Sequence, residues 1–291
     1  MALPEKACKA AALPDGRSLA YREYGDPSGI PVIFYHGGLN SRLFSPMWDR
    51  TQEATAAAGV RLIAIDRPGY GLSSFHTGRR YMDNVGDLKA LLTEVPGLAG
   101  QQVALLGYSS GGPHALAAAH GLAQEQGKGC RVGVVGIVSS DGPYVDMDLG
   151  PRHFGHSLPI TPVDAAVSAK HMAEGMRQSY KALADRPDRF RALTADLDEA
   201  LRQGICGCEQ DTLLERTSWG FRLEDVQCRV MLWQGTADRD VPVVVARHLA
   251  GRLPNCEASF VEGENHAMVR RKWDAILSSL ATEIRSGKSR L

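Results

Sequence analysis

Residues 102–126 read QVALLGYSSGGPHALAAAHGLAQEQ, and this stretch decides the fold. It begins with a short, uncharged, β-prone run, turns at a cluster of small residues, and continues as an alanine-rich segment that favours a helix. The turn contains a Gly-x-Ser-x-Gly pattern at 107–111, between the predicted strand and the predicted helix. A serine in that position is presented at the end of a buried strand, so Ser109 is the candidate nucleophile.

The glycines of this pattern have a steric explanation. The turn is so tight that the serine takes a strained backbone conformation, and the positions two before and two after it must be glycine to avoid a collision between strand and helix. An ordinary glycine-rich turn can produce the same five-residue pattern by chance. The rest of the chain has to decide between the two interpretations.

The segments around this turn alternate between strands and helices. Largely apolar, β-prone runs are expected at 31–35, 60–65, 102–106, 131–138, 229–233 and 256–261, and helices near 46–58, 113–126, 243–252 and 267–284. Buried strands alternating with helices predict an α/β fold with a mostly parallel, doubly wound sheet covered on both faces. A turn at Asp15-Gly16 between extended runs predicts an antiparallel hairpin at the sheet edge.

This alternation is interrupted after residue 142. Residues 143–208 contain no β-rich run, and their pattern favours helices at 163–183 and 189–203. We therefore expect one α/β core made of residues 15–142 and 209–285, with residues 143–208 inserted as a helical cap.

A serine hydroxyl needs a general base, and that base needs a carboxylate to fix its tautomer. Two candidates follow strands further along the chain: Asp238 comes directly after the predicted strand at 229–233, and His266 comes after the strand at 256–261. The carboxyl ends of parallel strands meet at one edge of a sheet, where ligands bind. Asp141, which follows the strand at 131–138, occupies an alternative position for the acid. We favour Asp238 because of its sequence context, with Gly-Thr-Ala before it and Val-Pro at 241–242, together with the order Ser, Asp, His.

Sequence blocks throughout the chain resemble the α/β-hydrolase superfamily, in the branch with an HG oxyanion loop and a helical cap. The blocks are YHGG at 35–38, DRPGYGLS at 66–73, GYSSG at 107–111, GTAD at 235–238 and GENH at 263–266. They occur in the expected order over nearly the whole chain, which makes the match more specific than any one motif.

The resemblance implies a catalytic triad of Ser109, His266 and Asp238. It also implies an oxyanion hole made by the backbone N–H groups of Gly38 and Ser110. Donors of this kind are worth about 3 kcal/mol each when aimed at the developing oxyanion. The expected function is hydrolysis of a small to medium carboxylic ester, or a related acyl transfer, without cofactor or metal.

Other functions remain compatible with the same residues. The triad would also support hydrolysis of an amide or aminopeptide, a lactone, or a carbon–carbon bond, and fold resemblance does not rank these reactions. A non-turnover member of the fold that binds a ligand in the capped pocket is a further alternative. Because position 109 is serine, chemistry that requires a carboxylate nucleophile is disfavoured.

Several polar residues of the motifs have simpler structural roles. We expect His36 to shape the turn of the HG loop through a backbone hydrogen bond, Asp66 and Arg67 to brace neighbouring loops, and His114 to be a packing or surface residue. Asn265 replaces the glycine that many relatives have before the histidine, which affects the expected substrate shape and leaves the triad unchanged.

Composition excludes some partners. The 291 residues include 33 Lys+Arg and 33 Asp+Glu, so the formal charge is zero, and 44% are hydrophobic. Without a basic excess we expect no nucleic-acid partner, and no stretch reads as a membrane span. We expect the N-terminus to be an unprocessed start of a cytoplasmic protein. We also expect the six scattered cysteines to be reduced thiols. The expected partner is a small-molecule substrate, and a homo-oligomer is compatible with the chain.

Overall fold

The computed structural model describes residues 8–44, 46–47, 50–126, 131–147 and 161–288. Within them a central sheet has the strand order β1-β2-β4-β3-β5-β6-β7-β8. The strands are β1 (Lys9–Ala12), β2 (Ser18–Gly25), β3 (Ile30–Tyr35), β4 (Val60–Ile65), β5 (Val103–Tyr108), β6 (Val132–Val138), β7 (Arg229–Gly235) and β8 (Cys256–Val261). From β4 to β8 all neighbours are parallel, which confirms the mostly parallel, doubly wound sheet.

The chain opens with the predicted antiparallel hairpin. Strands β1 and β2 pair antiparallel across a turn in which the Gly16 N–H donates to the Leu13 carbonyl. Strand β2 then pairs antiparallel with β4, so the hairpin forms one edge of the sheet. The Asp15-Gly16 signal therefore located this element correctly.

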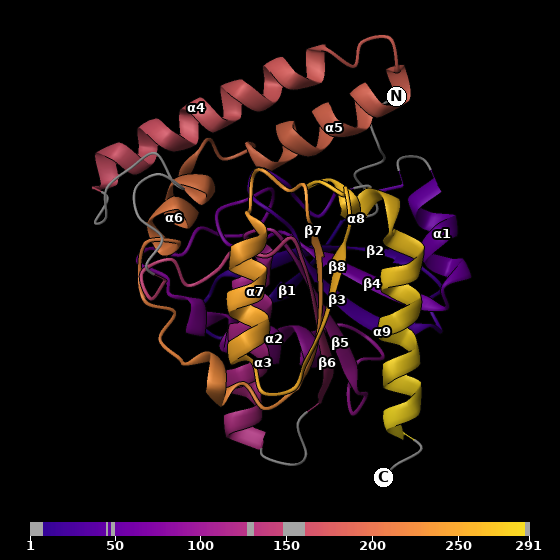
Figure 1. Cartoon of the computed structure of the whole chain (residues 1–291). Coiled ribbons are helices and arrows are strands. Elements are labelled where there is room, and N and C mark those ends of the chain that lie inside the picture. The colour runs from indigo at the N-terminus through magenta and orange to yellow at the C-terminus, as the bar shows by residue number, and fades with distance from the viewer. Residues whose placement is uncertain (1–7, 45, 48–49, 127–130, 148–160, 289–291) are drawn as a thin grey trace.

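Helices cover both faces of the sheet (Figure 1). One face carries α2 (Asn84–Glu94), α3 (Gly111–Gln126) and α7 (Val243–Arg252), and the other carries α1 (Thr51–Ala57) and α9 (Trp273–Lys288). Successive strand residues enter opposite cores: Ile33 packs with the first group of helices, whereas Val32 and Phe34 pack with the second. This alternation explains why the central strands are apolar along their whole length.

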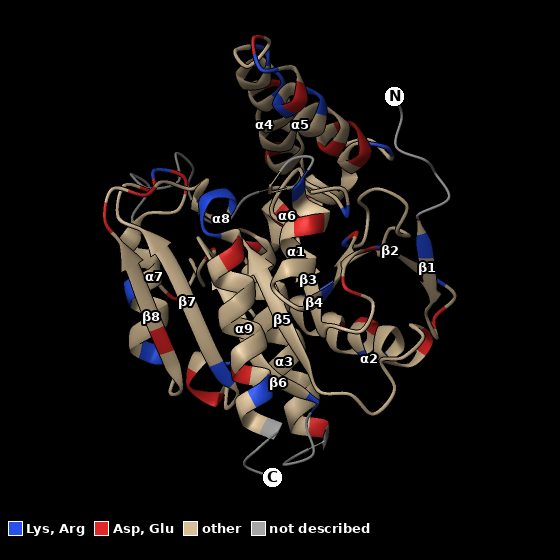
Figure 2. Cartoon of the chain, turned by 90° about the vertical axis from the view of Figure 1, so that its right-hand side faces the viewer, with Lys and Arg blue, Asp and Glu red and all other residues tan. Residues whose placement is uncertain are grey.

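The chain between β6 and β7 carries helices α4 (Pro162–Lys181), α5 (Pro187–Ala200) and α6 (Cys206–Leu214). We call them the cap helices for their place between these two strands, and the boundary expected at residue 208 falls inside α6. Helix α4 begins at a capping box, because the Thr161 side chain accepts from the Asp164 N–H and the Asp164 carboxylate accepts from the Thr161 N–H. Pro162 occupies the first turn. Helices α4 and α5 lie beyond the sheet edge that carries the short helix α8 (Met268–Arg271), and both acidic and basic residues are distributed along them (Figure 2).

The structure departs from the sequence prediction near the C-terminus. A single helix was expected at 267–284, but α8 ends at Arg271 and α9 starts at Trp273. The break at Lys272 lets Met268, Val269 and Trp273 all reach the core, where each is fully buried. In one continuous helix Val269 would share a face with Trp273, four residues further on, but Met268 would be rotated well away from Trp273.

Further short elements complete the described chain. They include the 3-10 helices at Tyr81–Asp83 and Leu223–Asp225. None of the helices in the described ranges is long and apolar enough to cross a membrane.

Candidate active site

Ser109 lies in the tight turn between β5 and α3, with a positive φ of 53° that is uncommon for a non-glycine residue. The flanking glycines are required by close approach. A Cβ on Gly107 would lie 2.6 Å from the Gly111 carbonyl oxygen, and one on Gly111 would collide with the Tyr35 carbonyl oxygen of the adjacent strand. The sequence pattern therefore marks a real steric constraint, and the turn is more than a chance match.

The structure brings Ser109, His266 and Asp238 into one hydrogen-bonded line, although they come from three separate loops. Ser109 Oγ is 3.1 Å from His266 Nε2, and His266 Nδ1 is 2.9 Å from Asp238 Oδ2. The Asp238 loop follows β7 and the His266 loop follows β8, so both reach the same sheet edge as the turn after β5. With Nδ1 donating to the carboxylate, Nε2 is the nitrogen available to accept the serine proton.

The loop around Asp238 holds this carboxylate in its ionised form. Its Oδ1 accepts the backbone N–H groups of Asp240 and Val241, each at 3.0 Å, and its Oδ2 accepts from Gln234 Nε2 at 3.1 Å. Burial alone would raise the pKa of Asp238, but the hydrogen bond from His266, the charge of His266 and the Val241 backbone N–H hold the pKa below its usual value. Burial would lower the pKa of His266, and the bond to Asp238 reverses this, so the pKa of His266 is raised.

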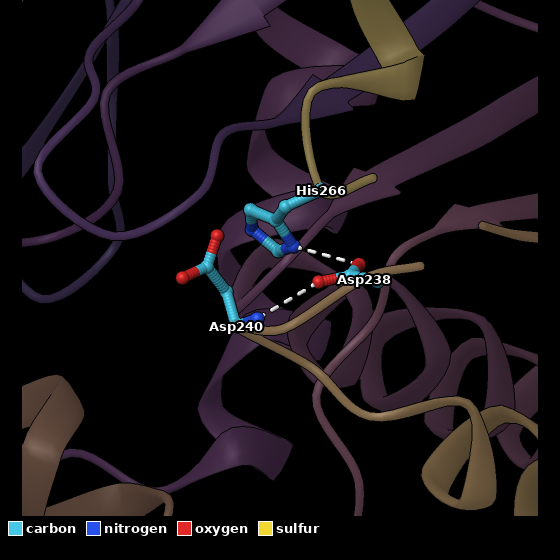
Figure 3. Close-up of side chains that lie close together, drawn as sticks. All are labelled: Asp238, Asp240 and His266. Atoms are coloured by element: carbon cyan, nitrogen blue, oxygen red, sulfur yellow. Dashed lines mark hydrogen bonds and ion pairs between the residues drawn. The ribbon is translucent and has the colours of Figure 1, made fainter. Parts of the chain in front are cut away.

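Asp240 places a second carboxylate beside the imidazole (Figure 3). Asp238, Asp240 and His266 offer possible metal-ligand atoms that lie within 4.8 Å of one another. Two of these groups already bond to each other, and Asp240 is exposed. The negative charge of Asp240 also contributes to the raised pKa of His266. Sequence reasoning did not single out Asp240, although its position two residues after Asp238 in the same turn was a usable signal.

Asp141, the alternative acid, is placed differently. Its Oδ1 accepts the Tyr144 hydroxyl at 2.6 Å, and its backbone N–H donates to the Ser109 carbonyl at 3.3 Å. Burial raises the pKa of Asp141, which favours the protonated carboxyl. Among the described contacts it is Asp238, and not Asp141, that bonds to His266.

The two segments expected to form the oxyanion hole lie against each other. A Cβ placed on Gly38 would be 3.5 Å from Ser110 Oγ, and one placed on Gly37 would be 3.1 Å from Ser109 Cβ. Leu39, the next residue of the HG loop, has a positive φ of 56°, so the loop is held in a strained conformation beside the serine.

His36 makes the backbone contacts that the sequence predicted for it. Its Nδ1 is 2.7 Å from the Gly37 carbonyl oxygen, and its Nε2 accepts the Arg67 backbone N–H at 3.1 Å. Since a carbonyl only accepts, Nδ1 must carry the proton. Complete burial lowers the pKa of His36 well below its usual value, so the ring is neutral.

Asn265 also stabilises its own loop. Its Oδ1 accepts the Ala267 backbone N–H at 3.1 Å and the Arg271 guanidinium at 2.8 Å. Tyr108, which precedes the nucleophile, packs its ring 5.3 Å from that of His266, and its hydroxyl donates to the His266 carbonyl at 3.3 Å. Both contacts position the segment that carries the imidazole.

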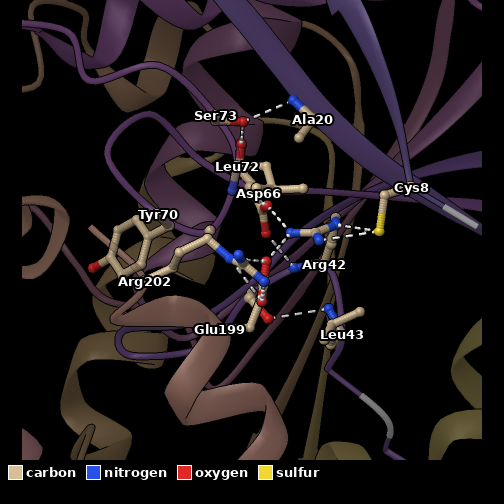
Figure 4. A network of polar contacts seen from close by, with 12 residues as sticks. Cys8, Ala20, Arg42, Leu43, Asp66, Tyr70, Leu72, Ser73, Glu199 and Arg202 are labelled. Atoms are coloured by element: carbon tan, nitrogen blue, oxygen red, sulfur yellow. Dashed lines mark hydrogen bonds and ion pairs between the residues drawn. The ribbon is translucent and has the colours of Figure 1, made fainter. Parts of the chain in front are cut away.

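Buried carboxylates of the cap helices contact the loop that follows β3. Asp196 of α5 accepts from Asn40 Nδ2 at 2.8 Å and from the Ser41 backbone N–H at 2.9 Å. Glu199 of α5 accepts from Arg42 Nη1 at 2.7 Å, and the same guanidinium forms an ion pair with Asp66 (Figure 4). The Asp66 carboxylate also accepts the Arg42 backbone N–H at 2.7 Å, so Asp66 braces the loop as the sequence predicted.

A groove of about 640 Å³ opens between the cap helices and the core, and its lining includes Tyr108 and Ala267, the chain neighbours of Ser109 and His266. Met176, Tyr180 and Leu193 line it from the cap side, and Phe44 and Tyr108 line it from the core side. Its lining is mainly apolar, although it also includes arginines, among them Arg270 of α8.

Comparisons with known proteins agree with this architecture. A model described as the alpha/beta hydrolase family matches residues 32–277. The chain is 27% identical over 285 residues to a non-heme chloroperoxidase from Streptomyces lividans, covering 94% of this chain and 98% of that protein.

Solved structures show the same fold. A bromoperoxidase from Bacillus anthracis superposes with a TM-score of 0.69 at 21% identity, covering 96% of this chain and 99% of that one. An esterase from Exiguobacterium antarcticum superposes with a TM-score of 0.69 at 19% identity, covering 95% of this chain and 99% of that one.

Proposed function

Because this chain belongs to the alpha/beta hydrolase family, we propose that it is a serine hydrolase that cleaves a small to medium carboxylic ester through an acyl-enzyme on Ser109. The observation that carries this proposal is the hydrogen-bonded line from Ser109 Oγ through His266 to Asp238, with spacings of 3.1 Å and 2.9 Å. Such a line supplies a nucleophile, a general base and a carboxylate that orients the base.

The first half of the reaction forms the acyl-enzyme. Ser109 Oγ attacks the ester carbonyl carbon while His266 Nε2 accepts the hydroxyl proton. The tetrahedral intermediate then collapses, the bond from carbon to the alcohol oxygen breaks, and His266 returns its proton to the departing alcohol. Asp238 stabilises the imidazolium between these two transfers, which is consistent with its lowered pKa and the raised pKa of His266.

The second half releases the acid. A water molecule gives one proton to His266 Nε2 and its oxygen attacks the acyl carbon. Collapse of this second intermediate breaks the bond to Ser109 Oγ, which takes the proton back from His266. The products are one alcohol and one carboxylic acid, and no electron transfer is needed.

The backbone N–H groups of Gly38 and Ser110 are the proposed donors to the oxyanion. The close approach of the HG loop to the turn after β5 supports this assignment, because a Cβ on Gly38 would lie only 3.5 Å from Ser110 Oγ. Removing one donor of this kind typically costs about 10²- to 10³-fold in kcat.

The apolar groove supports an ester with an apolar portion. Its cap-side wall contains Met176, and a flexible thioether adapts to acyl groups of different shape. The residues 143–208 would then form a cap that covers part of the substrate. Amide, lactone and carbon–carbon bond hydrolysis stay open as alternatives, as does a ligand-binding member without turnover.

The test is labelling with a fluorophosphonate, followed by intact-mass measurement and peptide mapping, together with turnover of p-nitrophenyl esters of increasing acyl length. We expect one adduct on Ser109, sustained turnover, and loss of both in Ser109→Ala. Folded wild-type protein that neither takes up the label nor turns over any ester would refute the proposal. A stable adduct without turnover would favour the ligand-binding alternative.

A further inference from the structure

The carbonyl of Gly37 is held by several donors among the described residues. It is contacted by His36 Nδ1 at 2.7 Å, Arg67 Nη2 at 3.2 Å and the Asn40 backbone N–H at 3.3 Å. This carbonyl and the N–H of Gly38 belong to one planar peptide unit, in which they point in opposite directions. Fixing the carbonyl therefore fixes the direction of the Gly38 N–H.

The same nitrogen of Arg67 reaches the other half of the proposed oxyanion hole. Nη2 also donates to Ser110 Oγ at 3.2 Å. A single guanidinium nitrogen thus contacts both segments whose N–H groups would hold the oxyanion. Its planar geometry is rigid, so it sets the spacing between Gly37 and Ser110.

The other terminal nitrogen of the guanidinium, Nη1, contacts one residue of the core and one residue of the cap helices. Nη1 is 2.9 Å from His114 Nε2 and 2.6 Å from the Asp211 carboxylate of α6. Burial lowers the pKa of His114 to about 3, so this imidazole is neutral and adds no further positive charge beside Arg67. Arg67 is fully buried, and it shares the carboxylate of Asp211 with a second buried arginine, Arg79.

We propose that Arg67 is a positioning residue for the oxyanion hole, held in place by Asp211 of the cap helices. This inference rests on the proposed serine-hydrolase function. It gives the motif arginine a role in catalysis in addition to bracing loops, and it makes α6 part of the support for the transition state.

Arg79 provides a matched control for a role that is only structural. Its guanidinium also pairs with Asp211 and donates to the Pro68 carbonyl at 3.1 Å, and it is almost as buried as Arg67. No contact joins it to Gly37 or Ser110 in the described structure. Arg67→Lys and Arg79→Lys both keep a positive charge near Asp211, but a lysine cannot span the acceptors that a guanidinium bridges.

The measured quantity is kcat for a p-nitrophenyl ester divided by kcat for its thionoester, with each kcat first divided by the rate constant for hydroxide-catalysed hydrolysis of the same compound. We call this ratio the preference for oxygen over sulfur. Sulfur is larger than oxygen and accepts hydrogen bonds less well, so a well-formed oxyanion hole favours the oxygen ester. We expect Arg67→Lys to lower kcat for the oxygen ester by about 10- to 100-fold with little change in KM, since the proposed donors act on the transition state. The preference for oxygen over sulfur should fall with it, whereas Arg79→Lys should keep the wild-type preference.

Ser110→Ala is a second variant that leaves the buried charges in place. It removes the Oγ that Arg67 contacts and retains the backbone N–H, and we expect it to lose part of the oxygen preference. Circular dichroism and thermal melting establish that each variant is folded.

Two results would overturn the inference: an equal loss of preference in Arg67→Lys and Arg79→Lys, or a wild-type preference in both Arg67→Lys and Ser110→Ala. Absence of ester turnover in the wild-type protein would instead refute the proposed function, and it would be seen before any variant is measured.

Discussion

Replacing Asp240 with asparagine tests the electrostatic environment of the catalytic base. The Asp240 carboxylate stands beside the His266 ring, with ligand atoms no more than 4.8 Å apart, and its charge stabilises the imidazolium. Asparagine keeps the shape and removes the charge. The pKa of His266 should therefore fall in Asp240→Asn, and the active, neutral imidazole should persist to lower pH.

The size of this change follows from Coulomb's law. Two unit charges separated by 4.8 Å attract by about 0.9 kcal/mol in bulk water, which corresponds to about 0.6 pH unit. A lower effective dielectric around the largely buried imidazole makes the interaction stronger. We therefore expect the pKa of His266, and with it the midpoint of the acidic limb of the pH profile, to fall by roughly 0.6 to 1 pH unit. Because Asp240 is exposed, 1 M salt should reduce the difference.

The assay is the pH dependence of kcat/KM for one p-nitrophenyl ester, whose acidic limb reports the base of the free enzyme. Wild-type activity should be lost as the pH falls through the raised pKa of His266, and the Asp240→Asn profile should lie at lower pH. Asp274→Asn, an exposed charge removal on α9, is the control and should leave the midpoint unchanged. A midpoint in Asp240→Asn that equals the wild-type value, or that lies at higher pH, would refute this reasoning.

Further predictions concern the acid, the cofactor requirement and the groove. Asp238→Asn should lower kcat by about 10⁴-fold because His266 loses the partner that fixes its tautomer, whereas Asp141→Asn should retain most activity; steady-state kinetics showing the reverse would reassign the acid. Dialysis against EDTA should leave ester turnover unchanged, since side chains and backbone N–H groups carry every proposed step, and a loss that zinc restores would contradict this mechanism. Met176→Trp should lower kcat/KM more for long-chain than for acetyl esters by narrowing the groove, and an equal loss over the ester panel would count against an acyl site there.

The sheet was predictable because its signals are local. The runs at Val60–Ile65 and Cys256–Val261 have the bounds that their apolar, β-prone composition indicated, and Asp15-Gly16 marked the hairpin turn. The match over residues 32–277 confirms the family resemblance, and this resemblance predicted the order in which the motif-bearing loops occur along the chain. The proximity of Ser109, Asp238 and His266 followed from one rule, that loops at the carboxyl ends of parallel strands share an edge.

Helix α6 was not predicted, and its composition explains why. Its buried residues include Gln210, Asp211 and Thr212, and no apolar stripe marks an inward face. The ion pair of Asp211 with Arg79 joins residues 132 positions apart. Pattern reasoning within one segment does not reveal such partners. It allowed His114 a packing role, which its burial confirms, but it gave no sign of the contact with Arg67.

The buried carboxylates of α5 and α6 have a consequence for evolution and for engineering. A segment inserted between two strands is commonly regarded as an exchangeable module. Here a graft of foreign helices would remove Asp211 from the buried Arg67, and breaking a buried pair in this way costs about 3 to 5 kcal/mol, whereas Arg42 would lose Glu199 but keep Asp66. Inserted segments in this lineage are therefore expected to change together with the arginines beneath them, and a chimera that transplants the segment should transplant its arginine partners as well.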